Sequence, residues 1–461
     1  MENTQKRHIF RAAISLFLVF IIASSAMTLS SCFEYEAGSK DEIIENIVNT
    51  SSEDTADYTY VMQYLSLWGV PTFDAVKLAW VEEIFQTHYK YGDGLPKTEE
   101  HAQATAYHFL EEYYDNIDKG NKTAVTDAII TSYVSMAGDP YAVYREPEEY
   151  SDYSDTINGT FGGIGVVVEY DHVNKTIMVS SVTKGAPAEA AGFRPGDFIV
   201  GVDGKTLEEI GYLNAIDHIR GKIGTSVTVT VDRNGERLDL TSERTAIDER
   251  SVGYAIDGNI GYIAVSGFKS NTYKQFAAAV DAVTEAGVEG VIFDMRNNPG
   301  GLVSIVCDMI SYLIPTGYSI VSYDFNSATI VIRSEDDVDP TTGEKSDKVL
   351  NLPMVVICNE YSASSAEIFT AAIRDYRDAG LIEAKIVGAT TYKKGIMQST
   401  FKHEDGSSIT CTIAYYNPPS GVNYHGIGIT PDVTVDIGET EDLQYKTAKR
   451  ELETLINANN N

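Results

Sequence analysis

From residue 253 onward, stretches typical of strands alternate with stretches typical of helices, and this alternation constrains the fold more than any other feature. The order is "IGYIAVSGF", "YKQFAAAVDAVTEAG", "EGVIFDM", "GLVSIVCDMISYLI", "PMVVICN" and "SAEIFTAAIRDY". It predicts a sheet with helices on its faces. In such folds the working groups gather at the carboxyl ends of the strands. We therefore expect an α/β core of mixed sheet, with its chemistry where the strands end.

Two regions with a different pattern precede this core. Three stretches carry apolar residues at helical spacing: residues 73–91, 99–117 and 122–138. After them come short β-branched runs divided by Gly, Asp and Asn, which are typical of strands and turns, with one helix expected over 208–221. The fold class is therefore multidomain α+β. The predicted parts are a helical region (74–155), a β-rich domain (156–247) and the α/β core (248–461).

Composition excludes one class of partner and favours no cofactor. The net charge of −32 argues against nucleic-acid binding, because phosphate binding needs clustered Lys and Arg. Cys307, Cys358 and Cys411 lie in apolar surroundings without CxxC spacing, so we expect buried side chains rather than a disulfide framework or a metal site. Neither a metal nor a nucleotide is implied.

The N-terminus has the pattern of a secretory signal. A basic start is followed by an apolar run from Ile14 to Ala26, which is short for a membrane span. "LSSC", ending at Cys32, resembles the bacterial lipobox; the alternative is a cysteine near an ordinary cleavage site. We expect a lipoprotein signal peptide over 1–31, a tether over 32–73 and lipid on Cys32. This would place the protein on the extracytoplasmic face of a bacterial membrane.

The stretch "YSASSAEIF" permits two interpretations. Ser364 and Glu367 have the S-x-x-E spacing of a helix capping box, in which the serine only satisfies an amide at the helix start. Alternatively, a serine here is a nucleophile raised on the first turn of a helix. The stretch alone does not decide between them.

Two further stretches at strand ends supply what a nucleophile needs. "NNPGG" contains Gly300 and Gly301, which allow backbone N–H groups to point into a cavity and hold an oxyanion. In "YKKGIMQ", a strand starting near Lys394 would place that lysine and Gln398 on one face and Lys393 on the other. A lysine acts as a general base only if burial lowers its pKa toward neutrality.

Together these stretches resemble the carboxyl-terminal processing (tail-specific) proteases, which are serine peptidases with a Ser–Lys dyad. "DMRNNPGG", "SASSAEIFTAAIRD", "KGIMQ" and "GIGITPDVTV" are similar to four motifs of that family. The resemblance covers residues 75 to 437. Two departures are a lysine at 393, where the family usually has glycine, and a few extra residues between the serine and the lysine.

The resemblance assigns roles by position. It implies Ser364 as nucleophile and Lys394 as general base, assisted by Gln398. The oxyanion hole would use the N–H of Ser365 and that of Gly300 or Gly301, and the sequence does not choose between the two glycines.

The β-rich domain resembles a PDZ module, on "FGGIGVVV" and "GAPAEAAGFRPGDFIVGVDGKTL". The resemblance implies that the N–H groups of Gly163, Ile164 and Gly165 capture a chain-terminal carboxylate while the peptide adds a strand. Residues near Leu213 would line the side-chain pocket. A PDZ-like fold that only spaces the other domains is the alternative.

We therefore expect a secreted, lipid-anchored endopeptidase that binds protein substrates by their C-termini, with oligomerisation left open. One alternative is a non-catalytic PDZ scaffold or holdase lipoprotein, and another is an acyl hydrolase. His425, with Asp294 or Asp432, is the best candidate for a histidine-based site, but the usual order and spacing of such a triad are not recognisable.

Overall fold

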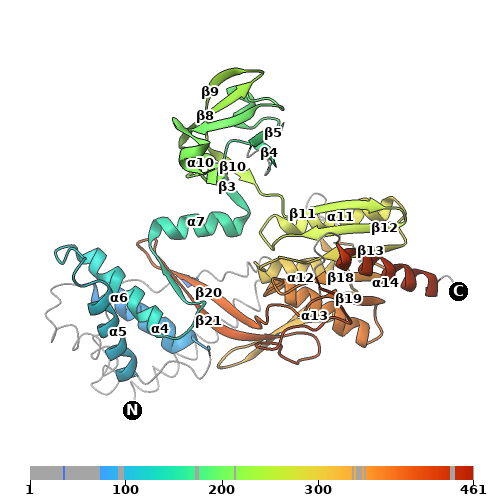
Figure 1. Ribbon diagram of the computed structural model, residues 1–461. Helices are drawn as coiled ribbons and strands as arrows, with labels where there is room; N and C mark the ends of the chain where they lie inside the picture. The colour runs from blue at the N-terminus through green and yellow to red at the C-terminus, as the bar shows by residue number, and fades with distance from the viewer. Residues whose placement is uncertain are drawn as a thin grey trace, which may run out of the picture. The chain divides into compact units, whose positions relative to one another are not determined.

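The computed structural model describes residues 35–36, 73–91, 98–171, 176–211, 214–334, 337–338, 345–346, 349–436 and 442–459. Figure 1 shows the chain coloured from its N-terminus to its C-terminus. Two compact units are present. Unit 1 contains the described parts of residues 1–150, 252–268 and 276–461, and unit 2 contains those of 151–251 and 269–275.

The helical region opens unit 1, as its periodicity predicts. Its helices are α4 (Ala75–His88), α5 (Thr98–Glu112) and α6 (Lys122–Met136). Asp74 caps α4 by accepting the N–H groups of Val76 and Lys77, and Asn121 caps α6 in the same way. The short strand β2 (Val143–Arg145) and helix α7 (Pro147–Asn158) follow.

The α/β core is built on a six-stranded sheet, which confirms the predicted fold class. Its spatial order is β11–β12–β13–β18–β19–β22, and all neighbours are parallel except the pair β11–β12. The strands are β11 (Val252–Asp257), β12 (Ile260–Val265), β13 (Gly290–Asp294), β18 (Met354–Cys358), β19 (Ala384–Gly388) and β22 (Val433–Thr434).

Helices cover both faces of this sheet. Successive residues of a strand point to opposite faces, so Ile292 and Phe293 of β13 serve different layers. Ile292 belongs to a cluster with residues of α14 (Leu443–Asn459), including Leu452. Phe293 contacts the rings of Phe276 in α11 (Thr272–Glu285) and Phe369 in α13 (Ser365–Asp378). Helix α12 (Val303–Ser311) follows the glycine turn.

A second sheet lies beside this core within unit 1. Its order is β1–β20–β21–β14–β15, and β2 of the helical region also pairs with β21. The strands are β1 (Tyr35–Glu36), β20 (Ile396–Lys402), β21 (Ser408–Asn417), β14 (Ser319–Asp324) and β15 (Thr329–Arg333). A separate two-stranded ladder joins β16 (Asp337–Val338) to β17 (Lys345–Ser346). The hairpin β20–β21 begins two residues after Lys394.

Unit 2 is a small β domain built around an apolar cluster that includes Ile177, Val229 and Val231. Its main sheet has the order β4–β5–β6–β8–β9, with β7 on β6, and β3 pairs with β10. Its elements are β3 (Thr160–Gly163), β4 (Val166–Asp171), β5 (Thr176–Val182), α8 (Pro187–Ala191), β6 (Phe198–Val202), β7 (Lys205–Thr206), α9 (Leu207–Ile210), α10 (Ala215–Ile219), β8 (Ser226–Arg233), β9 (Glu236–Glu243) and β10 (Thr245–Asp248). The single helix expected over 208–221 was wrong: Gly211, with φ 81°, ends α9, and α10 is separate.

Candidate active site

Ser364 lies in a strained turn between a buried strand and a helix. Strand β18 ends at Cys358, and α13 begins at Ser365. Ser364 has φ 57° and ψ −117°, a region that non-glycine residues rarely occupy and that costs about 1–3 kcal/mol. The residue is buried but keeps 9% of its surface exposed to solvent. This geometry presents a hydroxyl at the carboxyl end of a central strand.

The strained turn is held against the glycine turn that follows β13. Asn359 accepts the N–H of Asn297 at 3.0 Å and donates its amide to the Asn297 side chain at 2.9 Å. Ser362 donates its hydroxyl to the carbonyl oxygen of Met295, and Ala363 donates its N–H to that of Asn298. Ser362 is therefore a structural residue of the turn.

Gly300 is the glycine that faces the serine. A Cβ there would come within 2.7 Å of the Ser364 Cβ and 3.1 Å of the Ser365 nitrogen, whereas a Cβ at Gly301 would meet the carbonyl oxygen of Phe268 at 2.1 Å. Both positions exclude a side chain, for different reasons. The N–H of Gly300 is donated to Asn298 Oδ1 at 2.9 Å. The structure thus brings the predicted oxyanion groups together without choosing which glycine N–H serves.

Lys394 is half-buried, and its neighbour Lys393 is exposed. Burial lowers the pKa of Lys394 to about 8, while the negative charges of Asp139 and Glu367 oppose that fall. Its ammonium lies over the ring of Tyr141, 4.3 Å from the centroid. A lysine with a pKa near 8 is a suitable general base near neutral pH.

The Ser364 hydroxyl contacts Tyr416 rather than Lys394. Ser364 Oγ lies 2.9 Å from the Tyr416 hydroxyl, which in turn donates to the carbonyl oxygen of Lys394 at 3.1 Å. Because a tyrosine has one hydroxyl proton, Ser364 is then the donor in the first bond. In the described part of the chain, no hydrogen bond joins Lys394 Nζ to Ser364 Oγ. Sequence reasoning missed Tyr416, which the strand pattern marks only as a core residue.

Glu367 binds the main chain of both predicted catalytic residues. Its Oε2 accepts the N–H groups of Ser364 at 3.0 Å and Lys394 at 2.8 Å, and its Oε1 accepts the N–H of Lys393 at 2.8 Å and the Thr391 hydroxyl at 2.5 Å. The side chain is fully buried. Burial raises the pKa of Glu367, and the four donated hydrogen bonds oppose that rise. The glutamate of the S-x-x-E pattern therefore connects the main chains of Ser364 and Lys394. The serine hydroxyl does not take part in this connection, since it bonds to Tyr416.

Gln398 is placed differently from the expected alternation. Strand β20 starts at Ile396 rather than near Lys394, and its register with β21 shifts between Met397 and Gln398. Because Lys394 precedes the strand, strand alternation does not place it on a common face with Gln398. Gln398 donates Nε2 to Thr412 Oγ1 at 3.0 Å, so within the described residues its amide is engaged by β21.

The histidine alternative has no matching geometry. His425 Nδ1 accepts the N–H of Gly395 at 3.3 Å. Asp294 pairs with Arg296, and Asp432 pairs with Arg377. Neither acid bonds to His425 in the described part of the chain, so the three residues do not form a Ser-His-Asp relay.

The three downstream cysteines are buried free thiols whose pKa values burial raises. Among the residues that the structure describes, no group of three or more His, Cys, Asp or Glu side chains could hold a metal ion. Over the same residues, no helix is both long and apolar enough for a membrane span. Cys32 and the predicted signal segment lie outside the described residues.

The predicted carboxylate loop of unit 2 lies between β3 and β4. Ile164 is buried, and its carbonyl oxygen accepts the N–H of Ala188 at 2.8 Å. Gly165 has φ 84°, and a Cβ there would come within 2.3 Å of the Ala186 Cβ, so only glycine fits. Gly163 ends β3, opposite Thr245 of β10. Leu213 lies outside the described residues.

Comparisons with known proteins agree with this organisation. Residues 259–435 match the profile of peptidase family S41, and residues 162–243 match that of the PDZ domain. A probable CtpA-like serine protease of Staphylococcus aureus strain MRSA252 is 34% identical over 71% of this chain and 64% of its own length. The protein of that name from strain bovine RF122 / ET3-1 is 33% identical over 76% of this chain and 68% of its own length.

The chain thus spans slightly less than two thirds of the first of these relatives. The structure of a photosystem II D1 C-terminal processing protease covers 86% of this chain and 97% of its own, at 22% identity and a TM-score of 0.46. The family assignment depends on the sequence matches. The chain belongs to peptidase family S41, as a CtpA-like member that carries a PDZ domain.

Proposed function

We propose that this protein is a secreted, lipid-anchored serine endopeptidase with a Ser–Lys dyad, which receives substrate C-termini through its PDZ domain. One observation carries the catalytic part. The buried carboxylate of Glu367 binds the N–H groups of both Ser364 and Lys394. It thereby fixes the main chain of a strained serine relative to that of a lysine with a lowered pKa.

The reaction follows from these groups. Neutral Lys394 takes the proton of Ser364 as Oγ attacks the scissile carbonyl carbon. The N–H of Ser365, together with a glycine N–H from Gly300 or Gly301, stabilises the oxyanion. Lys394 then gives the proton to the leaving amine, and water hydrolyses the acyl-enzyme. The Ser364 hydroxyl must turn from Tyr416 to Lys394 Nζ before the first step.

Incubation with unfolded casein, followed by mass spectrometry of the fragments, tests the catalytic assignment. Ser364→Ala and Lys394→Ala should each reduce cleavage by at least about 10³-fold, since members of a catalytic unit cannot replace one another. Lys393→Ala is the matched control, and it should retain most activity because Lys393 is exposed. Cleavage by Ser364→Ala at the wild-type rate would exclude this nucleophile. Substrate binding by the wild-type protein without turnover would instead support the scaffold alternative.

Recognition of C-termini is proposed from the glycine loop that ends β3. N–H groups at Gly163, Ile164 and Gly165 are suited to a carboxylate, and an extended peptide can add a strand beside them. Full-length Ser364→Ala protein should bind a peptide with an apolar free C-terminus more tightly than the C-terminally amidated peptide. The expected difference is about 1.5 to 3 kcal/mol, the value of a hydrogen bond to a charged group. Equal affinities would rule out carboxylate recognition.

The anchor is proposed from the sequence "LSSC". Acyl chains on Cys32 would hold the protein at the extracytoplasmic face of a bacterial membrane, where two or more chains give stable attachment.

A further inference from the structure

The helical region reaches the catalytic lysine through the turn Asp139–Tyr141, which connects α6 to β2. The ring of Tyr141 lies under the ammonium of Lys394, with 4.3 Å between Nζ and the ring centroid. The face of an aromatic ring carries negative charge density and attracts a cation. The ring of Tyr141 therefore favours the protonated form of the lysine. In the sequence this turn marks only the end of a helical pattern.

Asp139 fixes this turn to the catalytic hairpin. It is buried, and its two carboxylate oxygens accept the N–H of Tyr141 at 2.9 Å and the N–H of Thr412 in β21 at 3.1 Å. The Thr412 hydroxyl in turn accepts the side-chain amide of Gln398 at 3.0 Å. One carboxylate thus orients the ring at Lys394 and binds the strand that engages Gln398.

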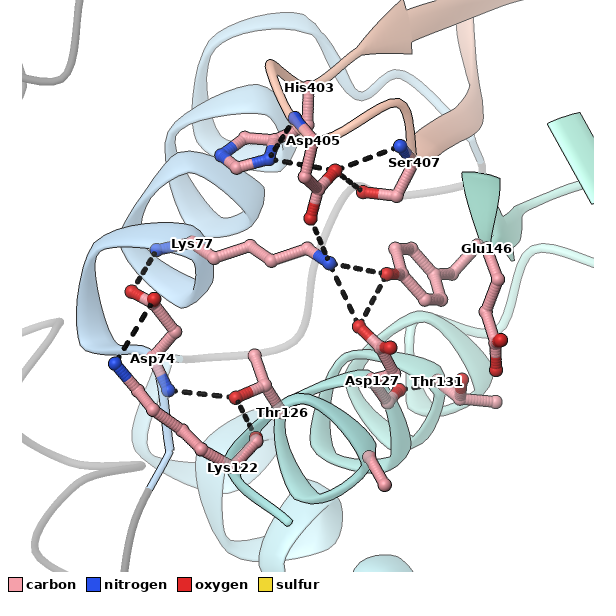
Figure 2. A network of polar contacts seen from close by, with 12 residues as sticks. Asp74, Lys77, Lys122, Thr126, Asp127, Thr131, Glu146, His403, Asp405 and Ser407 are labelled. Carbon is pink, nitrogen blue, oxygen red and sulfur yellow. Dashed lines mark hydrogen bonds and ion pairs between the residues drawn. The ribbon is translucent and has the colours of Figure 1, made fainter. Parts of the chain in front are cut away.

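A second anchor holds the helical region to the far end of the same hairpin. Figure 2 shows Lys77 of α4 between Asp127 of α6 and Asp405 in the β20–β21 turn. Lys77 also bonds to the hydroxyl of Tyr144 in β2. Lys77 Nζ lies 2.8 Å from each carboxylate and 2.6 Å from the tyrosine hydroxyl. Strand β2 also pairs with β21 directly. Attached at both ends of the hairpin, the helical region has little freedom to move Tyr141 away from Lys394.

We propose that the Asp139–Tyr141 turn is a positioning element of the active site, which holds the ammonium of Lys394 away from Ser364 and sets the pH at which the lysine becomes a base. This inference rests on the proposed Ser–Lys function. It gives the helical region a role in catalysis beyond that of a surface domain.

The charged and titratable groups around Lys394 come from several parts of the chain. The helical region contributes Asp139 and Tyr141, α13 contributes Glu367, and β21 contributes Tyr416, which bonds to the lysine carbonyl. His425 bonds to the next residue, Gly395, and Lys393 precedes the lysine. The carboxylates of Asp139 and Glu367 favour the ammonium, whereas burial favours the amine. The ring of Tyr141 also favours the ammonium through its cation–π contact. Removal of the ring should therefore lower the pH at which Lys394 loses its proton.

Competitive labelling tests this directly, without any need for activity. Ser364→Ala protein is treated with limiting acetic anhydride between pH 6 and pH 11, and the acetylation of Lys394 is followed by tandem mass spectrometry. Exposed Lys393 in the same peptide is the internal reference. Tyr141→Leu should move the Lys394 midpoint down by about 0.4 to 0.7 pH unit, the equivalent of an exposed cation–π contact. Tyr141→Phe keeps the ring face and should leave the midpoint in place.

Two further variants complete the design. Asp139→Asn removes a charge and should also lower the midpoint, while Tyr107→Leu, at a 49% exposed position on α5, should not. In otherwise wild-type protein, the rising limb of kcat/KM against pH should shift with the labelling midpoint. Coincident midpoints for Tyr141→Leu and Tyr141→Phe would overturn the inference. A shifted labelling midpoint, together with no cleavage by the protein that retains Ser364, would contradict the protease proposal alone.

Discussion

At the scale of single residues, Ser364 and Glu367 show why a capping pattern and a catalytic pattern coincide here. The glutamate does bond to the N–H of the serine, as a capping residue would. The same carboxylate also takes the N–H groups of Lys393 and Lys394, which are distant in sequence. The serine hydroxyl is thereby left for Tyr416 and for chemistry. The two interpretations of "YSASSAEIF" are thus compatible.

Glu367→Gln should disable the site while most of the fold survives. Each carboxylate oxygen of Glu367 accepts two hydrogen bonds from N–H or O–H groups. A glutamine would place its NH₂ group, which can only donate, against two of these donors in either orientation of the amide. We expect kcat/KM to fall by at least about 10²-fold, because loss of positioning by a fraction of an ångström costs that much.

Two measurements separate positioning from a general loss of stability. Glu367 favours the ammonium of Lys394, so its neutralisation should move the rising limb of any residual activity below the wild-type position near pH 8. The base acts when deprotonated, and a lower pKa therefore shifts the limb to lower pH. Glu360→Gln, in the same turn but exposed, should match the wild type. An unshifted limb with full activity in Glu367→Gln would refute the role given to this carboxylate.

At the scale of elements, the hairpin β20–β21 connects the residues of the candidate active site to the helical region. Lys394 precedes it, and Tyr416 and Thr412 belong to its second strand. Its turn is fixed by buried Lys77, which pairs with buried Asp127 and with exposed Asp405. Burial works to lower the pKa of Lys77, but the hydrogen bonds to its three partners raise it above the usual range, so this lysine stays charged.

Lys77→Met should cost far more stability than the matched change at an exposed ion pair. Removal of Lys77 leaves Asp127 buried without its cation, and such a change typically lowers the free energy of unfolding by about 3 to 5 kcal/mol. We expect the lower figure, because the second partner, Asp405, is 39% exposed and stays solvated when the lysine is removed. Lys122→Met breaks a pair with Asp74 whose side chains are 57% and 43% exposed, and should cost at most about 1 kcal/mol.

Urea unfolding followed by tryptophan fluorescence measures both variants, because buried Trp80 lies in α4 beside His403 of the hairpin turn. Equal losses for the two variants would show that the Lys77 cluster does not fasten the hairpin.

At the scale of the whole molecule, the proposed peptidase combines a binding unit, a catalytic unit and an anchor. The PDZ domain and the S41 domain are separate matches along the chain, and the structure divides the chain between them. The anchor depends only on the N-terminal sequence. An anchor on Cys32 would place the catalytic unit where secreted or membrane-attached chains pass.

Cys32→Ser should therefore release the protein from the membrane fraction or leave an unprocessed precursor. The reason is that the proposed lipid would be attached to the cysteine sulfur, and a serine hydroxyl would not replace it. Metabolic labelling with a palmitate analogue, followed by fractionation, measures the effect. Ser31→Ala, which keeps the cysteine, is the control and should remain labelled. Labelling of Cys32→Ser at the wild-type level would show that the lipid lies elsewhere.

The sequence by itself determined the elements and the order of the motifs. Helical periodicity, β-branched runs and strand–helix alternation depend on local spacing, and so do the positions of Ser364 and Lys394 at the ends of strands. The resemblance to a known family added their roles. Helix boundaries and the break at Gly211 were harder to predict, because they depend on single backbone conformations.

Only the tertiary structure decided which side chains meet. Tyr416 and Tyr141 contact the serine and the lysine from distant parts of the chain, and strand alternation could not reveal either contact. The register shift after Met397 skips Ile413 of β21 and so places Thr412 opposite Gln398, where the two side chains bond. The lowered pKa of Lys394 likewise comes from burial that the fold creates. Local spacing carries no information about such long-range packing. The sequence therefore predicted which residue types form the site, and only the structure gave their contacts and burial.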